Sequence, residues 1–388
     1  MSPRARAILL LFGGLLWLGA GGLVLAAALE VTFRIRQAAD APPPSDPRYL
    51  ELEAAYQPFT IQHLHPSFLF WFPLDPAARR ALNNRVITLS DEGFRGSSPM
   101  EKGTRKVAFI LGGSAAFGHF ATRDETTISG YLNALQDQYL FVNAGVPSWV
   151  SSQELERLAL ELVAYQPALV IAYDGFNDAA TGADYAKRGI TMPPGTPESF
   201  DELSNLVDDI RGTRRATRQR LHRQLFPHLM NAVDTWREGG QPQVSQPRSP
   251  HMSEAAAGVM RTAAAAYAQN ITTMSRLTSA SGARFIGVFQ PVLSLHAHRP
   301  VGTSCDRDRF QPELELFHQT VRARLPRDIE YLDFAALFDR DYSSVPRFCA
   351  QSGDHLVDQV FVDSVHLFDP GNKRVAEELW QLIQPLAR

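Results

Sequence analysis

Short apolar runs alternate with amphipathic segments over the larger, C-terminal part of the chain. Apolar positions at helical spacing predict helices over residues 151–165, over the Ala-rich stretch 255–280, and from residue 370 to the end. Runs of strand length lie between them, at residues 106–111, 139–142, 168–173, 284–289 and, more weakly, 329–333. Strands that alternate with helices predict a parallel sheet covered on both faces, with ligands bound beyond the C-terminal ends of its strands.

A separate apolar run at residues 7–29 contains no charged residue and is long enough for a helix that crosses a bilayer. Arg4 and Arg6 precede it, which favours an N-terminus that stays in the cytoplasm, although Arg34 and Arg36 on the far side weaken this preference. We therefore predict cytoplasmic residues 1–6, an uncleaved transmembrane signal anchor at 7–29, and a body on the periplasmic side of the inner membrane. A cleaved signal peptide is the alternative.

The rest of the chain divides into a spacer and one domain. Residues 30–60 are Pro-rich and predict a semi-extended spacer. Residues 61–388 form the predicted domain, with an insertion at about 181–250 between the third and fourth strands. The basic stretch within it, residues 211–223, is typical of a solvated helix face, and contact with anionic lipid headgroups is its functional alternative.

Charge and cysteine content narrow the classes of function. A net charge of −3 argues against a nucleic-acid partner. The 2 cysteines, Cys305 and Cys349, are too few for a zinc ribbon; in an exported body they predict a disulfide, with two unpaired thiols as the alternative. His296 and His298 lack a third ligand, so we predict no metal and no cofactor. The oligomeric state stays open.

Polar residues follow the first three predicted strands. Ser114 comes directly after Gly112 and Gly113, where it would begin a helix whose free N–H groups favour an oxyanion, or would simply cap that helix. Gly145 and Asn177 follow the next two strands and are candidate oxyanion donors, although both residue types are also common in turns.

Two further titratable residues, Asp363 and His366, precede the last predicted helix. Their spacing allows a carboxylate to orient an imidazole that takes the serine proton. We expect His119, five residues after Ser114, at a surface position of a helix rather than at the border of the site.

In this order the blocks Gly113-Ser114, Gly145, Gly175-x-Asn177 and Asp363-x-x-His366 resemble those of the SGNH or GDSL hydrolase superfamily. The Gly-Phe-Arg-Gly sequence at residues 93–96 looks like the lead-in of many bacterial membrane-anchored members. The resemblance covers residues 62–388 apart from the insertion. It implies a flavodoxin-like three-layer α/β/α sandwich with a five-stranded parallel sheet.

The resemblance also implies roles for these residues. Ser114 would be the nucleophile, His366 the general base, and Asp363 the group that orients it. The backbone N–H groups of Ser114 and Gly145, with the Asn177 side chain, would form the oxyanion hole. One departure is Gly113, which stands where the family usually has an acidic residue.

We therefore expect an exported, membrane-tethered serine hydrolase that cleaves a carboxylic ester of a small molecule, lipid or glycan through an acyl-enzyme. One alternative is an O-acyltransferase that transfers acetyl groups to an envelope polysaccharide. The other is a non-catalytic scaffold in an envelope complex.

Overall fold

The computed structural model describes residues 80–189, 252–297, 311–340 and 359–384, together with residues 48, 51–52, 54–56, 191 and 193–194. All of them fall within one compact unit, which comprises Ser45–Asp201 and Met252–Arg388. Predictions for the anchor at residues 7–29, most of the spacer, the basic stretch, Cys305, Cys349 and His298 lie outside the described residues. Within the part that is described, no helix has both the length and the apolar character needed to span a membrane.

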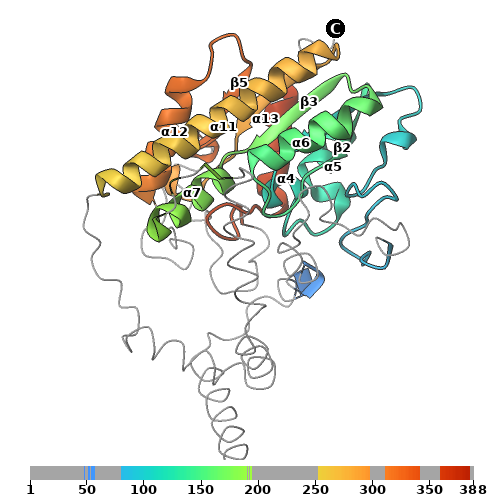
Figure 1. Cartoon of the computed structure of the whole chain (residues 1–388). Coiled ribbons are helices and arrows are strands. Elements are labelled where there is room, and N and C mark those ends of the chain that lie inside the picture. The colour runs from blue at the N-terminus through green and yellow to red at the C-terminus, as the bar shows by residue number, and fades with distance from the viewer. Residues whose placement is uncertain are drawn as a thin grey trace, which may run out of the picture. The chain divides into compact units, whose positions relative to one another are not determined.

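In the part of the chain that the structure describes, five parallel strands form the sheet, in the spatial order β2-β1-β3-β4-β5. This is the flavodoxin-like order of doubly wound sheets, so the predicted fold class is confirmed for the described domain. The strands are β1 (Lys106–Leu111), β2 (Tyr139–Asn143), β3 (Leu169–Asp174), β4 (Arg284–Phe289) and β5 (Tyr331–Asp333). Figure 1 labels β2, β3 and β5.

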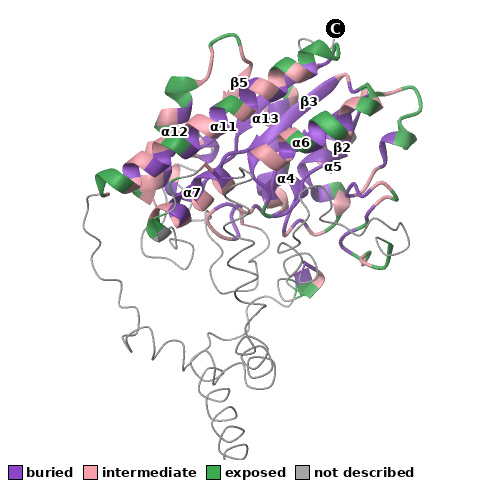
Figure 2. Ribbon diagram, viewed as in Figure 1, coloured by how far each residue is buried: buried purple, intermediate pink, exposed green. Residues whose placement is uncertain are grey.

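Helices cover both faces of this sheet because its central strands carry apolar residues on both sides (Figure 2). In β1, Val107 and Phe109 belong to one buried cluster, while Ala108 and Ile110 belong to another. The first cluster includes residues of α6 (Ser151–Leu160), α7 (Phe176–Arg188), α11 (Glu254–Ala280) and α12 (Gln311–Arg324). The second includes residues of α4 (Ser114–Phe117), α5 (Ile128–Leu135) and α13 (Asp369–Ile383).

Two predicted boundaries differ from the structure by several residues. The helix expected over residues 151–165 ends at Leu160, and the chain continues as a 3-10 turn, Leu162–Tyr165, of the kind common at helix C-termini. The insertion was placed from about residue 181, but α7 continues to Arg188. This part of α7 is packed against the domain: Ala183 is buried in the first cluster, and a Cβ at Gly182 would lie 2.9 Å from the Ala263 Cβ of α11.

Candidate active site

The turn between β1 and α4 places Ser114 at the C-terminal edge of the sheet. Gly112 has a φ of +148°, and a Cβ there would lie 2.2 Å from the Tyr173 carbonyl oxygen. A Cβ at Gly113 would lie 2.2 Å from the Asn177 amide nitrogen. Both glycines are therefore required for the close approach of β3 and α7. Because Gly113 has no side chain, the Asn177 amide occupies the space that an acidic side chain would fill.

Ser114, His366 and Asp363 form one continuous chain of hydrogen bonds. The Nε2 atom of His366 lies 2.8 Å from the Ser114 hydroxyl oxygen, although the two residues are 252 positions apart in the sequence. The other ring nitrogen, Nδ1, lies 2.7 Å from Oδ2 of Asp363. An isolated bridge between Phe361 and Leu367 closes the loop that carries both residues.

The surroundings of Asp363 keep it ionised. Burial alone would raise its pKa, but the charge of His366, together with hydrogen bonds from His366 and from the Val365 N–H, outweighs burial and lowers the pKa to about 2. Oδ1 accepts the backbone N–H groups of Val365 and His366 at 2.9 and 2.8 Å. A carboxylate at this place favours a proton on Nδ1 of His366, which leaves Nε2 as the acceptor that faces Ser114.

The three expected oxyanion donors differ in what they contact. As the first residue of α4, Ser114 has a backbone N–H without an acceptor inside its helix. Asn177 donates one amide proton to the Trp149 carbonyl at 2.8 Å, which leaves its second amide proton for an oxyanion. The Gly145 N–H is donated to Oδ1 of Asn143 at 3.1 Å. A buried N–H takes the nearest acceptor, so an oxyanion would have to share or replace this bond.

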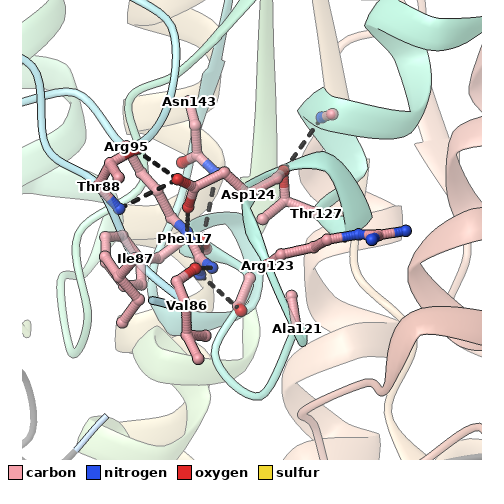
Figure 3. A network of polar contacts seen from close by, with 12 residues as sticks. Val86, Ile87, Thr88, Arg95, Phe117, Ala121, Arg123, Asp124, Thr127 and Asn143 are labelled. Carbon is pink, nitrogen blue, oxygen red and sulfur yellow. Dashed lines mark hydrogen bonds and ion pairs between the residues drawn. The ribbon is translucent and has the colours of Figure 1, made fainter. Parts of the chain in front are cut away.

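Arg95, in the Gly-Phe-Arg-Gly sequence, fixes the far end of α4 (Figure 3). Its side chain is buried, with 3% of the residue exposed. Nη1 donates to the carbonyls of Phe117 and Gly118 at 3.0 and 2.9 Å, and Nε donates to Asp124 at 2.7 Å. The four-residue helix that begins with Ser114 therefore ends on a charged side chain that satisfies its last carbonyls.

His119 and Tyr56 were not identified from the sequence as parts of the site's support. His119 is 6% exposed rather than at the surface, because its ring packs between Tyr56 and His366. Burial, and next the charge of His366, lower the pKa of His119 well below 6.5. The Tyr56 hydroxyl lies 2.8 Å from both the Gly118 and Ala121 carbonyl oxygens, which share its one proton. These contacts join segments that are distant in sequence, so no local sequence motif predicts them.

Three buried carboxyl groups lie behind the site, on α6, β3 and α7. Burial raises the pKa of Glu154 well above 4.5, and the neighbouring Asp174 raises it further. Burial, then the charge of Asp174, raises the pKa of Asp178 to about 7. Asp178 accepts the Ser151 N–H at 3.0 Å and the Ser151 hydroxyl at 2.7 Å, and Asp174 accepts from the Tyr267 hydroxyl.

A cavity of about 690 Å³ with a mixed polar and apolar lining is found at the C-terminal ends of β4 and β5. It adjoins the loop of Asp363 and His366, because the Leu293 N–H donates to the Ser364 carbonyl at 2.8 Å. Its charged and amide side chains come mainly from α12 and β5: Gln311, Glu315, His318, Gln319, Arg322 and Asp333.

Of the two histidines considered for metal binding, His296 lies in the described part of the chain and His298 lies outside it. His296 follows a 3-10 turn and is buried, with Nδ1 2.8 Å from the Val292 carbonyl oxygen. Its Nε2 accepts the Phe338 N–H at 3.3 Å. Among the residues that the structure describes, no group of three or more His, Cys, Asp or Glu side chains is placed to hold a metal ion.

No family model and no curated protein matches the chain. Solved structures similar to it include an acetyl xylan esterase, at 11% identity, which covers 71% of this chain and 99% of that chain with a TM-score of 0.37. A GDSL-like lipase from Bacteroides thetaiotaomicron is 14% identical and covers 75% and 93%, with a TM-score of 0.36. A variant of a Geobacillus acetyl-xylooligosaccharide esterase is 12% identical and covers 72% and 94%, with a TM-score of 0.39.

The geometry of the site is independent of these likenesses. That geometry unites the blocks found in the sequence. Ser114, His366 and Asp363 form one hydrogen-bonded chain, and Asn177 lies against the turn that carries the serine. In strand order, in the order of its four blocks and in this Ser-His-Asp arrangement, the chain resembles the SGNH or GDSL hydrolase superfamily.

Proposed function

We propose that this protein is a serine hydrolase that cleaves a carboxylic ester through an acyl-enzyme. The observation that carries the proposal is the hydrogen-bonded chain from Ser114 through His366 to Asp363. Helix N-termini and side-chain amides stabilise negative charge, and both Ser114 and Asn177 offer such donors beside the nucleophile. A turn serine with no function would not require an oriented imidazole at 2.8 Å.

The reaction follows from these positions. The Ser114 oxygen attacks the ester carbonyl carbon while Nε2 of His366 takes the hydroxyl proton. The oxyanion of the tetrahedral intermediate accepts from the Ser114 N–H and the Asn177 amide. The carbon–oxygen bond to the alcohol then breaks, and His366 returns the proton to that leaving oxygen. Water repeats the sequence on the acyl-enzyme, which releases the carboxylic acid and restores Ser114.

For the alcohol portion of the ester we favour a polar, hydroxyl-rich group such as a glycan over a long apolar chain. The support is the cavity of about 690 Å³ beside the catalytic loop, with its amide and charged lining. A cavity of this size accepts a small-molecule ligand. Ligands with many hydroxyls can hydrogen-bond to such groups on burial, whereas an apolar chain would remove water from them and offer no hydrogen bond in return.

Tethering to the inner membrane, with the catalytic domain on the periplasmic side, is also part of this proposal. It is supported by the uncharged apolar run at residues 7–29 and the arginines that precede it. Protease treatment of spheroplasts would test it. The domain should be degraded without detergent, and protection of the domain in intact spheroplasts would contradict the orientation.

Hydrolysis of p-nitrophenyl acetate by the wild type and by Ser114→Ala tests the chemistry. Removing a triad member should lower kcat by about 10⁴-fold or more while the fold survives. Equal rates in the two proteins would contradict the proposal.

Acyl transfer to an envelope polysaccharide uses the same residues and differs only in what attacks the acyl-enzyme. Product analysis with an acetyl ester, in the presence and absence of a glycan acceptor, separates the two. Our proposal predicts acetate as the main product in both cases. Acetylated glycan as the main product would favour the transferase.

A further inference from the structure

Two adjacent residues at the start of α7 bind the same loop, the one that connects β2 to α6. Asn177 donates its side-chain amide to the Trp149 carbonyl at 2.8 Å. Asp178 accepts the Ser151 N–H at 3.0 Å and the Ser151 hydroxyl at 2.7 Å. The amide that we assign to the oxyanion hole therefore takes its orientation from a loop that its own neighbour holds in place.

We propose that Asp178 is a positioning residue for the oxyanion hole: by fastening Ser151 to α7 it holds the Trp149 carbonyl that orients the Asn177 amide. This inference rests on the proposed ester hydrolysis and extends it to a residue that does not reach the substrate. An amide on a two-bond side chain can rotate, so one proton reaches the oxyanion correctly only if the other is held elsewhere.

The loop needs such a fastening because its own backbone is not relaxed. Ser148, an exposed residue just before Trp149, has a φ of +67°. A residue with a Cβ in this left-handed region is held there by its surroundings. On the other side of the loop, Ser151 is the first residue of α6, and its N–H is one of the donors that a helix leaves without an internal acceptor.

The environment of Asp178 suits a fixed acceptor. Ser151 is buried, and its hydroxyl also accepts from the Asn270 amide of α11 at 2.9 Å, which fixes the direction of its own proton toward Asp178. Burial raises the pKa of this carboxyl to about 7, the hydrogen bonds from Ser151 oppose that shift, and above pH 7 the group is a carboxylate that accepts both bonds. Every described partner of the Asp178 carboxylate therefore points to an acceptor of two hydrogen bonds at this place.

A double-mutant cycle on p-nitrophenyl acetate hydrolysis tests the proposal in the full chain. Asn177→Ala removes the donor and should lower kcat by about 100-fold. Asp178→Asn keeps the size of the side chain but offers Ser151 only one acceptor oxygen, and misplacing the amide should lower kcat by about tenfold with KM unchanged. The double variant should be no slower than Asn177→Ala alone, because Asp178 acts only through that amide.

Two more variants keep the test informative. Ser151→Ala removes the hydroxyl bond to Asp178 and keeps the backbone bond. It should show part of the kcat loss, and it provides the test if Asp178→Asn folds poorly. Glu330→Gln alters the ion pair with Arg284 at the amino end of β4, far from the C-terminal edge, and should retain the wild-type rate. Circular dichroism and the melting temperature are recorded for each variant.

The outcomes separate the two claims. A double variant about tenfold slower than Asn177→Ala would show independent effects and would overturn the inference, as would wild-type kcat in Asp178→Asn and Ser151→Ala. Absence of ester hydrolysis by the wild type would overturn the proposed function, and this inference with it. If the wild type is active but the kcat losses of Asn177→Ala and Asp178→Asn are additive, the inference about Asp178 is overturned and the proposed function stands.

Discussion

The imidazole of His119 packs against that of His366, with ring centroids 5.0 Å apart and ring planes inclined by 39°. His119 is buried, and its Nδ1 has no hydrogen-bond partner among the described residues. The residue that would take the serine proton thus rests on a second imidazole that the protein holds neutral.

Replacing His119 with Phe should make folding less sensitive to acid. The pKa of His119 in the fold is well below 6.5, so below about pH 6.5 the unfolded chain binds a proton that the native chain does not. Native stability is then lost as the pH falls, by at most about 1.4 kcal/mol per pH unit. Urea unfolding at pH 7 and pH 5 measures it. A stability difference between variant and wild type that does not change with pH would contradict the assignment.

Replacing Arg95 with Ala should destabilise the domain and the nucleophile turn together. The change leaves the Phe117 and Gly118 carbonyls without this donor and deprives Asp124 of its ion pair. Loss of a buried charged partner costs about 3–5 kcal/mol. Arg95→Lys retains the charge but not the fork of donors, so its stability should lie between those of the wild type and Arg95→Ala. Thermal unfolding gives the order; equal melting temperatures would show that the network contributes nothing.

Asp363→Asn should lower kcat by about 10⁴-fold with little change in KM, because an amide favours the wrong tautomer of His366. Steady-state kinetics measure this loss. The pH dependence of unfolding provides a second measurement. With its pKa lowered to about 2, Asp363 contributes stability that is fully present above about pH 4 and is lost as the pH falls toward 2. The variant should lack this contribution, and an identical acid unfolding profile would contradict the pairing.

Glu154→Gln should stabilise the protein increasingly as the pH rises. Burial and Asp174 hold the pKa of Glu154 well above 4.5, so above about pH 4.5 the native chain keeps a proton that the unfolded chain has lost. Wild-type stability therefore falls with rising pH until the native group also ionises. Melting temperatures at pH 5 and pH 8 test this. The gain of the variant should be larger at pH 8, and a gain that is equal or larger at pH 5 would exclude a raised pKa.

The fold and the positions of the catalytic candidates could be predicted because their signals are local. Apolar runs marked β1 to β4 to within a residue, and the C-terminal ends of parallel strands meet at one edge, which brought Ser114 and Asn177 together without knowledge of packing. Only the weak run at 329–333 began two residues before β5.

What could not be predicted depends on contacts between distant segments. His119 was expected at the surface, but Tyr56 and the loop of His366 cover it. The hydrogen bond from the Gly145 N–H to the Asn143 side chain depends on the folded conformation of the loop, which the sequence does not specify. Arg95 belongs to a recognised sequence, but its hydrogen bonds to the last carbonyls of α4 and to Asp124 follow only from the folded position of that helix. Residue types indicate which chemistry is possible, and the fold determines which donors and acceptors already have hydrogen-bond partners.

The most direct test of the central claim is mapping a serine-reactive fluorophosphonate adduct by mass spectrometry on the folded protein. We predict one adduct, on Ser114, which is absent in Ser114→Ala and forms far more slowly in His366→Ala. An adduct on another residue, or none on the folded wild type, would contradict the assignment of Ser114 as the nucleophile and would favour a non-catalytic scaffold.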